Sequence, residues 1–216
     1  ENSNSQNNDS NSNLNDSFID DQLNLYIESI NLENFKDYYE KAIIKKNDKE
    51  FEEASIILRA LIVKGSILYN SELNINLAMI YFYLGDTFLE KMEFETDILG
   101  NGFQINEKNL ETKTLNSNLQ KINEEHENSN DESSENEEIE EIQIVWENLD
   151  TCRIILERYI NEQKNLNIND QNLIYDKMYK CYRRLGDCEN FRENFQQAIE
   201  EYNKGLDILQ KINNLN

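Results

Sequence analysis

Two small residues at fixed spacing near the C-terminus constrain the fold most strongly. Gly186 and Ala198 lie twelve positions apart, each inside a stretch whose apolar residues recur at helical spacing. Small residues at such positions let two consecutive helices cross closely. The space around the crossing is expected to be filled by four larger side chains: Tyr182, Leu185, Phe195 and Tyr202. The 216 residues contain no proline, so the helical pattern is not broken by a proline at any position.

The same arrangement occurs upstream, but there its two halves are separated. Tyr81 and Leu84-Gly85 repeat the first-helix pattern, whereas the position twelve residues after the glycine holds Asp97. The second-helix pattern resumes only around Cys152, so about 55 residues are inserted. A further copy of the second-helix pattern stands nearer the N-terminus: Phe51, Ala54, Leu58 and Leu61. Since one helical hairpin cannot bury its apolar face alone, the copies are expected to stack.

This spacing is the helix–turn–helix signature of tetratricopeptide repeats. We therefore predict an all-α protein, a tetratricopeptide (TPR) helical-hairpin solenoid of about three repeats, whose second repeat is interrupted by a disordered acidic insertion. Residues 1–13, rich in Asn and Ser, are predicted to be a disordered tail. Residues 14–98 hold an N-terminal helix (14–30), repeat one and the first helix of repeat two. Residues 99–139 are the insertion, and residues 140–216 hold the second helix of repeat two and repeat three, without a fourth repeat.

The composition excludes several classes of protein. The net charge of −22, from 43 acidic and 21 basic residues, argues against direct nucleic-acid binding and against an anionic membrane surface. Three cysteines exclude a disulfide framework, and the chain has a single histidine. We predict no cofactor, no metal and no enzymatic activity, since neither a nucleophile–base pair nor a metal-binding cluster is visible. The chain opens on Glu1 without an apolar signal segment, which favours a fragment of a cytosolic or nuclear protein.

Nearly half of the excess negative charge lies in residues 124–141. The ten acidic residues of this tract are Glu124, Glu125, Glu127, Asp131, Glu132, Glu135, Glu137, Glu138, Glu140 and Glu141. A flexible polyanion can attract a basic partner over a long range and mask its charge. The alternative is a solvated linker that keeps the protein in solution. Ser129 and Ser134 each have an acid three residues on, and phosphorylation would add about −1.5 to −2 charge per site.

Three segments carry a more specific likeness. They read YFYLGDTFLEKMEFETDILGN (81–101), VWENLDTCRIILERY (145–159) and LGDCENFRENFQQAIEEYNKGLDIL (185–209). With the first repeat, they resemble the NASP-type interrupted-repeat histone chaperones over roughly residues 33–210. The resemblance implies a histone chaperone that binds and escorts core histones three and four, with linker histone as a further client, for nuclear delivery and chromatin assembly.

The resemblance also implies a location in the nucleus, with a cytoplasmic pool. The chain departs from the family pattern because a fourth repeat, a C-terminal capping helix and a basic nuclear-import run are missing from it. The sequence leaves open whether the protein forms a homodimer.

A second candidate site is the concave face that stacked repeats form with their first helices. The residues predicted to face this groove and to bind the histone are Phe82, Asp86, Glu90, Asp187 and Asn190. Their three carboxylates are the expected contacts for a basic client. The alternatives are ordinary solvated helix charges and, for Phe82, a place in the core. Trp146 and Cys152 are expected to be packing residues.

The competing function is a generic TPR adaptor, for example one that binds the C-terminal peptides of chaperones. Lys180 and Arg184 have the spacing of a carboxylate clamp in the third repeat. The corresponding helices of the first two repeats offer Tyr39, Ile43 and Tyr83 in place of Asn and Lys. The clamp is therefore incomplete, and the net charge would repel an acidic peptide.

Overall fold

The computed structural model describes residues 9–98, 132–163 and 165–215. Within these ranges it contains seven α-helices, one short 3₁₀ helix and no strand. The elements are α1 (Asp9–Ser29), α2 (Phe35–Asn47), α3 (Phe51–Leu68), η1 (Ile75–Leu77), α4 (Ala78–Ile98), α6 (Glu132–Glu162), α7 (Ile168–Phe191) and α8 (Phe195–Leu215). The predicted all-α class is confirmed.

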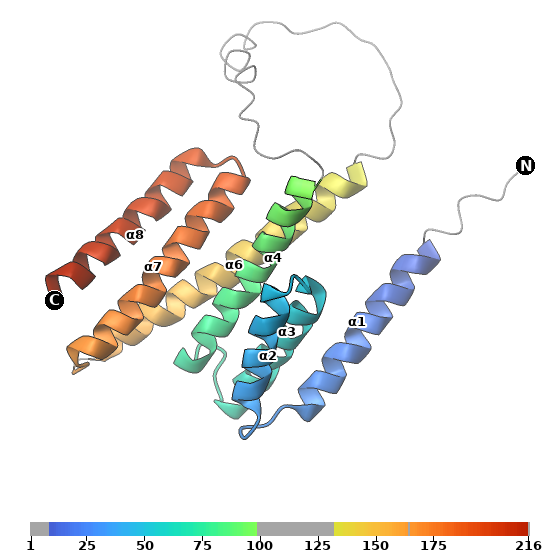
Figure 1. Cartoon of the computed structure of the whole chain (residues 1–216), viewed down its shortest axis with the longest axis horizontal. Coiled ribbons are helices and arrows are strands. Elements are labelled where there is room, and N and C mark those ends of the chain that lie inside the picture. Colours follow the sequence, from blue (N-terminus) through green and yellow to red (C-terminus); the bar gives the residue numbers. More distant parts are fainter. Residues whose placement is uncertain (1–8, 99–131, 164, 216) are drawn as a thin grey trace, which may run out of the picture.

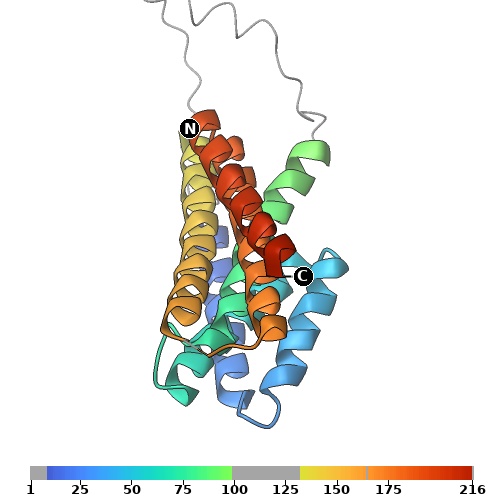
Figure 2. The same ribbon diagram turned by 90° about the vertical axis from the view of Figure 1, so that its left-hand side faces the viewer.

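The helices pair as hairpins that stack in chain order (Figure 1). Helix α2 packs on α3, α4 on α6, and α7 on α8, while contacts of α3 with α4 and of α6 with α7 join one pair to the next. Figure 2, which views the stack from the α8 side, shows α6 on the left and α2 on the right, with α4 running obliquely between them. The long second-repeat insertion therefore leaves α4 and α6 paired as one hairpin, as the sequence predicts.

Glycine residues permit the closest helix crossings. A Cβ atom added to Gly85 would lie 2.9 Å from Leu149 Cγ and 3.0 Å from the Val145 carbonyl oxygen. A Cβ atom on Gly186 would collide with the ring of Tyr202. The glycines predicted at the α4–α6 and α7–α8 crossings are thus required by the packing of the helices.

One residue predicted to fill the α7–α8 crossing lies elsewhere. Tyr182 and Leu185 are buried, but the Phe195 side chain is 59% exposed. Phe195 is the first residue of α8, and the ring of Tyr202 already lies against Gly186. The phenyl ring therefore has no place at the crossing and faces the surface.

The same short turn joins α2 to α3 and α7 to α8. In each turn a backbone N–H closes on the carbonyl five residues earlier, from Glu50 to Lys45 at 2.9 Å and from Asn194 to Glu189 at 2.8 Å. The residues with left-handed backbone angles in the two turns are Lys49 (φ 63°) and Glu193 (φ 59°). In the second repeat the insertion takes the place of this turn.

Two helices begin earlier than the sequence pattern predicts. Helix α1 begins at Asp9 rather than at residue 14, and α6 begins at Glu132 rather than at residue 140. Neither extra stretch contains a glycine or proline that would end a helix, so each helix continues through polar sequence. The rest of the predicted tail and insertion lies outside the described residues. Helix α1 packs against α3, where the Tyr26 hydroxyl donates a 3.0 Å hydrogen bond to Glu53.

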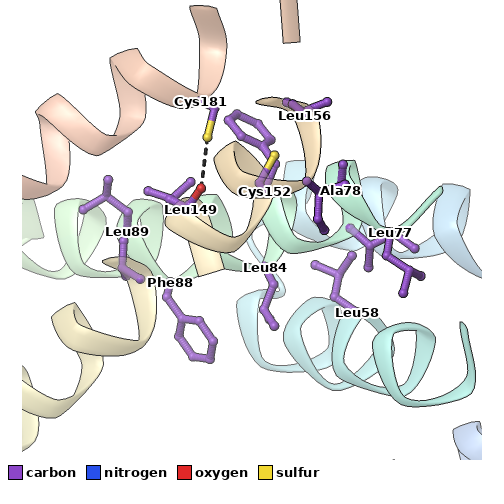
Figure 3. Packing of buried hydrophobic residues seen from close by; sticks show 14 of the residues in the cluster. Leu58, Leu77, Ala78, Leu84, Phe88, Leu89, Leu149, Cys152, Leu156 and Cys181 are labelled. Atoms are coloured by element: carbon purple, nitrogen blue, oxygen red, sulfur yellow. Dashed lines mark hydrogen bonds between the residues drawn. The ribbon is translucent and has the colours of Figure 1, made fainter. Parts of the chain in front are cut away.

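The core runs without a break through the stacked hairpins. Leucines from α3, η1, α4 and α6 meet around Leu84 and Leu149, both nearly inaccessible to solvent (Figure 3). Cys152 and Cys181 extend this core toward α7, and the Cys181 thiol donates to the Leu149 carbonyl oxygen at 3.0 Å. Cys152 is therefore a packing residue, as predicted.

Candidate functional site

A buried ion network connects the first helices of all three repeats. Its centre is Asp86 on α4, which is only 8% exposed. One carboxylate oxygen, Oδ2, lies 2.9 Å from Lys46 Nζ on α2. The other, Oδ1, accepts a 2.5 Å hydrogen bond from Arg184 Nε on α7. A single carboxylate thus pairs with two buried cations that come from the repeats on either side.

Both cations have further carboxylate partners nearer the surface. Lys46 Nζ lies 2.6 Å from Glu90, and Arg184 Nη1 lies 3.1 Å from Glu93 and 3.0 Å from Asp187. Burial opposes the charge of Arg184, but the adjacent carboxylates raise its pKa above the ordinary value. We name these six residues, Lys46, Asp86, Glu90, Glu93, Arg184 and Asp187, the interrepeat network.

The outer carboxylates of the network are half-exposed. The Glu90 and Glu93 side chains are 41% and 42% exposed, whereas those of Lys46 and Arg184 are 6% and 7% exposed. Burial raises the pKa of Glu93, and the Arg184 charge only partly offsets this effect. With four carboxylates and two cations, the network presents a negative rim to solvent and keeps its cations inside.

The five predicted groove residues have different environments. Phe82 is buried and makes an edge-to-face contact with Tyr83 at 5.3 Å, so the alternative of a core position applies to it. Asp86 is buried and paired, as described above. Glu90 and Asp187 are partly exposed members of the network, and Asn190 is half-buried near the end of α7.

Asp187 also orients a tyrosine of the next helix. The Tyr202 hydroxyl donates a 2.8 Å hydrogen bond to Asp187 Oδ1. Burial and this hydrogen bond raise the pKa of Tyr202 to about 12. The carboxylate predicted as a client contact therefore also joins α7 to α8.

Most of the acidic tract cannot be placed in the structure. Glu124, Glu125, Glu127 and Asp131 lie outside the described residues, as do Ser129 and the side chains at positions 132–140. The backbone from Glu132 onward is helical, as the first part of α6. Glu141 is described in full, and its carboxylate accepts a 2.8 Å hydrogen bond from Lys91 on α4. This end of the tract thus takes part in the α4–α6 contact.

Lys46, Glu93 and Arg184 belong to the network but were not predicted as groove residues. Lys46 stands in a pair of lysines at the end of its helix, and that pattern usually marks a solvated helix end. Only a weak signal was available: the first helices of the two flanking repeats each carry a cation, and the first helix between them carries Asp86.

The structure also bears on the carboxylate clamp. Lys180 is half-exposed and lies 2.7 Å from Asp176 on its own helix, whereas the Arg184 guanidinium is buried among three carboxylates. Arg184 is therefore not presented to the carboxylate of an external peptide.

The described residues offer no assembled catalytic or metal centre. Among them, no group of three or more His, Cys, Asp or Glu side chains is placed to hold a metal ion. All three cysteines are reduced and buried. Burial raises the pKa of Cys188 to about 12 and that of Cys181 well above its ordinary value. None of the described helices combines the length and apolar character needed to cross a bilayer.

The stacked hairpins, with a second hairpin split by a long insertion, define a TPR-like helical repeat protein. Residues 180–216 match the family model of the SHNi-TPR domain. This is the motif of the NASP-type interrupted-repeat histone chaperones, so the predicted resemblance is confirmed. Members of that family are non-enzymatic histone chaperones. Neither the curated proteins nor the solved structures compared with the chain gave a match.

Proposed function

We propose that this protein is a histone chaperone that binds and escorts core histones three and four, with linker histone as a further client. The observation that carries the proposal is the SHNi-TPR match in the last hairpin, together with a second hairpin interrupted by acidic sequence. The work of such a protein is binding and release, with no covalent step.

The charge distribution supports a basic client. Histones are strongly basic, and the chain carries a net charge of −22. Long-range attraction speeds the capture of an oppositely charged protein, and salt weakens it because the screening length falls to about 8 Å at physiological ionic strength. The proposed roles are capture by the acidic tract and docking in the groove of the repeats.

The buried network refines the choice of groove contacts. Asp86 already neutralises two internal cations, so a client gains little from its charge. Glu90, Glu93 and Asp187 expose part of their carboxylates around it. We therefore propose these three as the groove's contacts with basic histone side chains, and we keep Asn190 as a polar neighbour.

The biological setting follows from the client. A protein that masks the charge of newly made histones would deliver them to the nucleus for chromatin assembly. We propose a nuclear location with a cytoplasmic pool, in line with the nuclear role that the family implies. A homodimer is compatible with this function. Measuring the molecular mass of the purified protein in solution tests for it.

The test is a titration of a purified dimer of histones three and four against the full chain, at low and high ionic strength. One variant lacks residues 100–131, which leaves α6 complete, and another carries amides in place of Glu124, Glu125, Glu127 and Asp131. Both should bind more weakly, with a shallower dependence on salt. Unchanged affinity and salt dependence in both would mean that the four acidic residues before α6 belong only to a linker.

The groove is tested separately by Glu93→Gln, with Glu33→Gln, at an exposed position before α2, as its control. The groove variant should bind the histone dimer more weakly, whereas the control should not. Failure of the unmodified chain to bind the histone dimer, combined with binding of an acidic C-terminal peptide, would favour the adaptor function.

A further inference from the structure

A second groove lies at the end of the α7–α8 hairpin, apart from the interrepeat network. Its walls come from α6, from the turn after α7 and from the first turns of α8, and its volume is about 930 Å³. None of the six network residues lines it. We name it the hairpin-end groove. Its size is that of a site that receives side chains of a peptide rather than single ions.

Two aromatic rings line this groove from different helices. Trp146 extends from α6 and Phe195 from the start of α8. Trp146 is only partly buried, although it also packs against the core, and Phe195 is 59% exposed. An exposed phenylalanine at a helix start contributes little to folding. The pair of rings offers π-faces of the kind that attract cations, with tryptophan the strongest of the aromatic residues in this respect.

The polar lining of the groove is predominantly acidic. Three carboxylates line it, from Glu189, Glu193 and Glu201, against one guanidinium from Arg192. Glu189 is 3% exposed and accepts hydrogen bonds from Arg192 at 3.3 Å and from Asn194 at 2.8 Å. Glu189 and Glu201 are buried, where a lower local dielectric strengthens their attraction for a positive charge, whereas Glu193 is exposed at the rim of the groove.

One carboxylate oxygen in the lining lacks a donor. Glu201 is 8% exposed, and its Oε1 accepts from Gln197 at 2.9 Å and from Lys204 at 2.7 Å. Its other oxygen, Oε2, is buried and accepts no hydrogen bond from any residue that the structure describes. A buried acceptor without a donor costs free energy that an entering N–H group would recover.

The guanidinium of Arg192 shows which charge suits the groove. It reaches from the end of α7 to Glu189, and its Nη2 donates a 3.5 Å hydrogen bond to Gln143 on α6. A cation thus already spans the groove, and its own side chain remains partly exposed although its partner Glu189 is buried. Together with the aromatic pair and the unpaired Glu201 oxygen, this favours a cationic occupant.

We propose that the hairpin-end groove binds a cationic side chain of a basic peptide segment, stacked on Trp146 and Phe195 and facing the groove's carboxylates. The inference deepens the proposed function, because a histone segment is the basic partner that the protein would place there. The groove by itself indicates only that its occupant carries a positive charge next to an exposed aromatic ring.

Trp146 is the chain's single tryptophan, so tryptophan fluorescence reports on the surroundings of this one ring. The probe is hexalysine, and its control is fully Nε-acetylated hexalysine, which keeps the chain length but loses the charge. Hexalysine should change the Trp146 emission and saturate, and the acetylated peptide should not. The acidic tract can also bind hexalysine, so the variants below are needed to assign the Trp146 response to the groove.

Variants then assign the response to the groove. Phe195→Ala should weaken the Trp146-detected binding by about twofold to fivefold, the usual range for an exposed cation–π contact. Leu206→Ala, at a similarly exposed position of α8 outside the groove, should leave this binding unchanged. Glu193→Gln should weaken binding, whereas Glu200→Gln, outside the groove, should do so much less. Arg192→Gln should strengthen binding, because it removes the resident cation.

The outcomes separate this proposal from the proposed function. If the chain binds the histone dimer, but hexalysine leaves the Trp146 emission unchanged and the groove variants behave like their controls, the groove proposal is overturned and the histone function stands. If hexalysine binds as described but histones do not, the groove stands without that function. If Phe195→Ala instead alters the mass of the protein in solution, the groove holds a second copy of the chain and the proposal is wrong.

Discussion

Asp86 on α4 and Arg184 on α7 lie 98 positions apart in the chain, and a 2.5 Å hydrogen bond from Arg184 Nε to Asp86 Oδ1 joins them. The contact connects the half of the protein that precedes the insertion to the half that follows it. Because Lys46 pairs with the other oxygen of Asp86, the same carboxylate holds three repeats in register.

Replacing Asp86 should therefore be costly. In Asp86→Ala, both Lys46 and Arg184 lose a buried partner, and breaking a buried pair on one side usually costs about 3–5 kcal/mol. Urea unfolding followed by circular dichroism measures the change. Asp176→Asn, which removes an exposed pair with Lys180, is the control and should cost less than about 1 kcal/mol. Equal losses in the two variants would show that the network does not hold the repeats together.

A pair of glycine substitutions tests the close crossing of α4 and α6. Gly85→Ala brings a Cβ atom within 3.0 Å of Leu149 and of the Val145 carbonyl oxygen, and such overpacking costs about 1–3 kcal/mol. Gly205→Ala is the matched control, since its nearest neighbours would be at 3.6 Å. The control should be stabilised by about 0.5–1 kcal/mol, because alanine favours a helix interior over glycine. Melting temperatures should move in opposite directions, and a shared direction would contradict the close crossing.

Glu53 should make stability depend on acid pH. Its hydrogen bond with Lys45, aided by those with Lys41 and Tyr26 and opposed by burial, lowers its pKa from 4.5 to about 2. Because the folded-state pKa is the lower one, this stabilisation is complete above pH of about 4.5 and is lost as the pH falls toward 2.

The size of that effect is limited by solvent screening, since Glu53 is partly exposed, and we expect about 1 kcal/mol. In Glu53→Gln the loss of stability between pH 5 and pH 3 should be smaller than in the unmodified chain, by about half that amount, because the rest of the effect is lost only below pH 3. Denaturant unfolding across this pH range gives the comparison, with the exposed neighbour Glu52→Gln as control. A pH profile of Glu53→Gln that matches the unmodified chain would rule out this role.

The three cysteines should be unreactive while the protein is folded. All are buried, and the raised pKa of Cys181 and Cys188 disfavours the thiolate that reacts. An aromatic disulfide reagent should label almost none of them at mildly alkaline pH, and all three once urea unfolds the chain. Rapid labelling of the native protein would mean that the α4–α6–α7 core opens readily.

Much of the architecture could be predicted from local spacing. The positions of Gly85, Gly186 and Ala198 predict the crossings of the helices, and the absence of the expected small residue at position 97 locates the interruption. The starts of α1 and α6 were predicted less accurately, because polar stretches such as residues 132–139 contain no residue that prevents a helix.

The candidate site was harder to predict. Asp86 and Glu90 were expected to be available for binding a basic client, but in the folded protein both pair with Lys46. Phe195 was expected in the core and lines a surface groove with Trp146 instead. In each case the deciding neighbour belongs to another helix, and spacing along one helix carries no information about it.

The sequence by itself determined the helices, their pairing and the interruption, because these follow from which residues recur every three or four positions and from small residues at crossings. Only the tertiary structure decided which charges are available to a partner. Lys46, Asp86 and Arg184 come from three separate hairpins, and their ion pairs exist only where stacking removes them together from water. A buried charge must find a partner wherever the fold places it, whereas the same residue on an isolated helix would remain solvated.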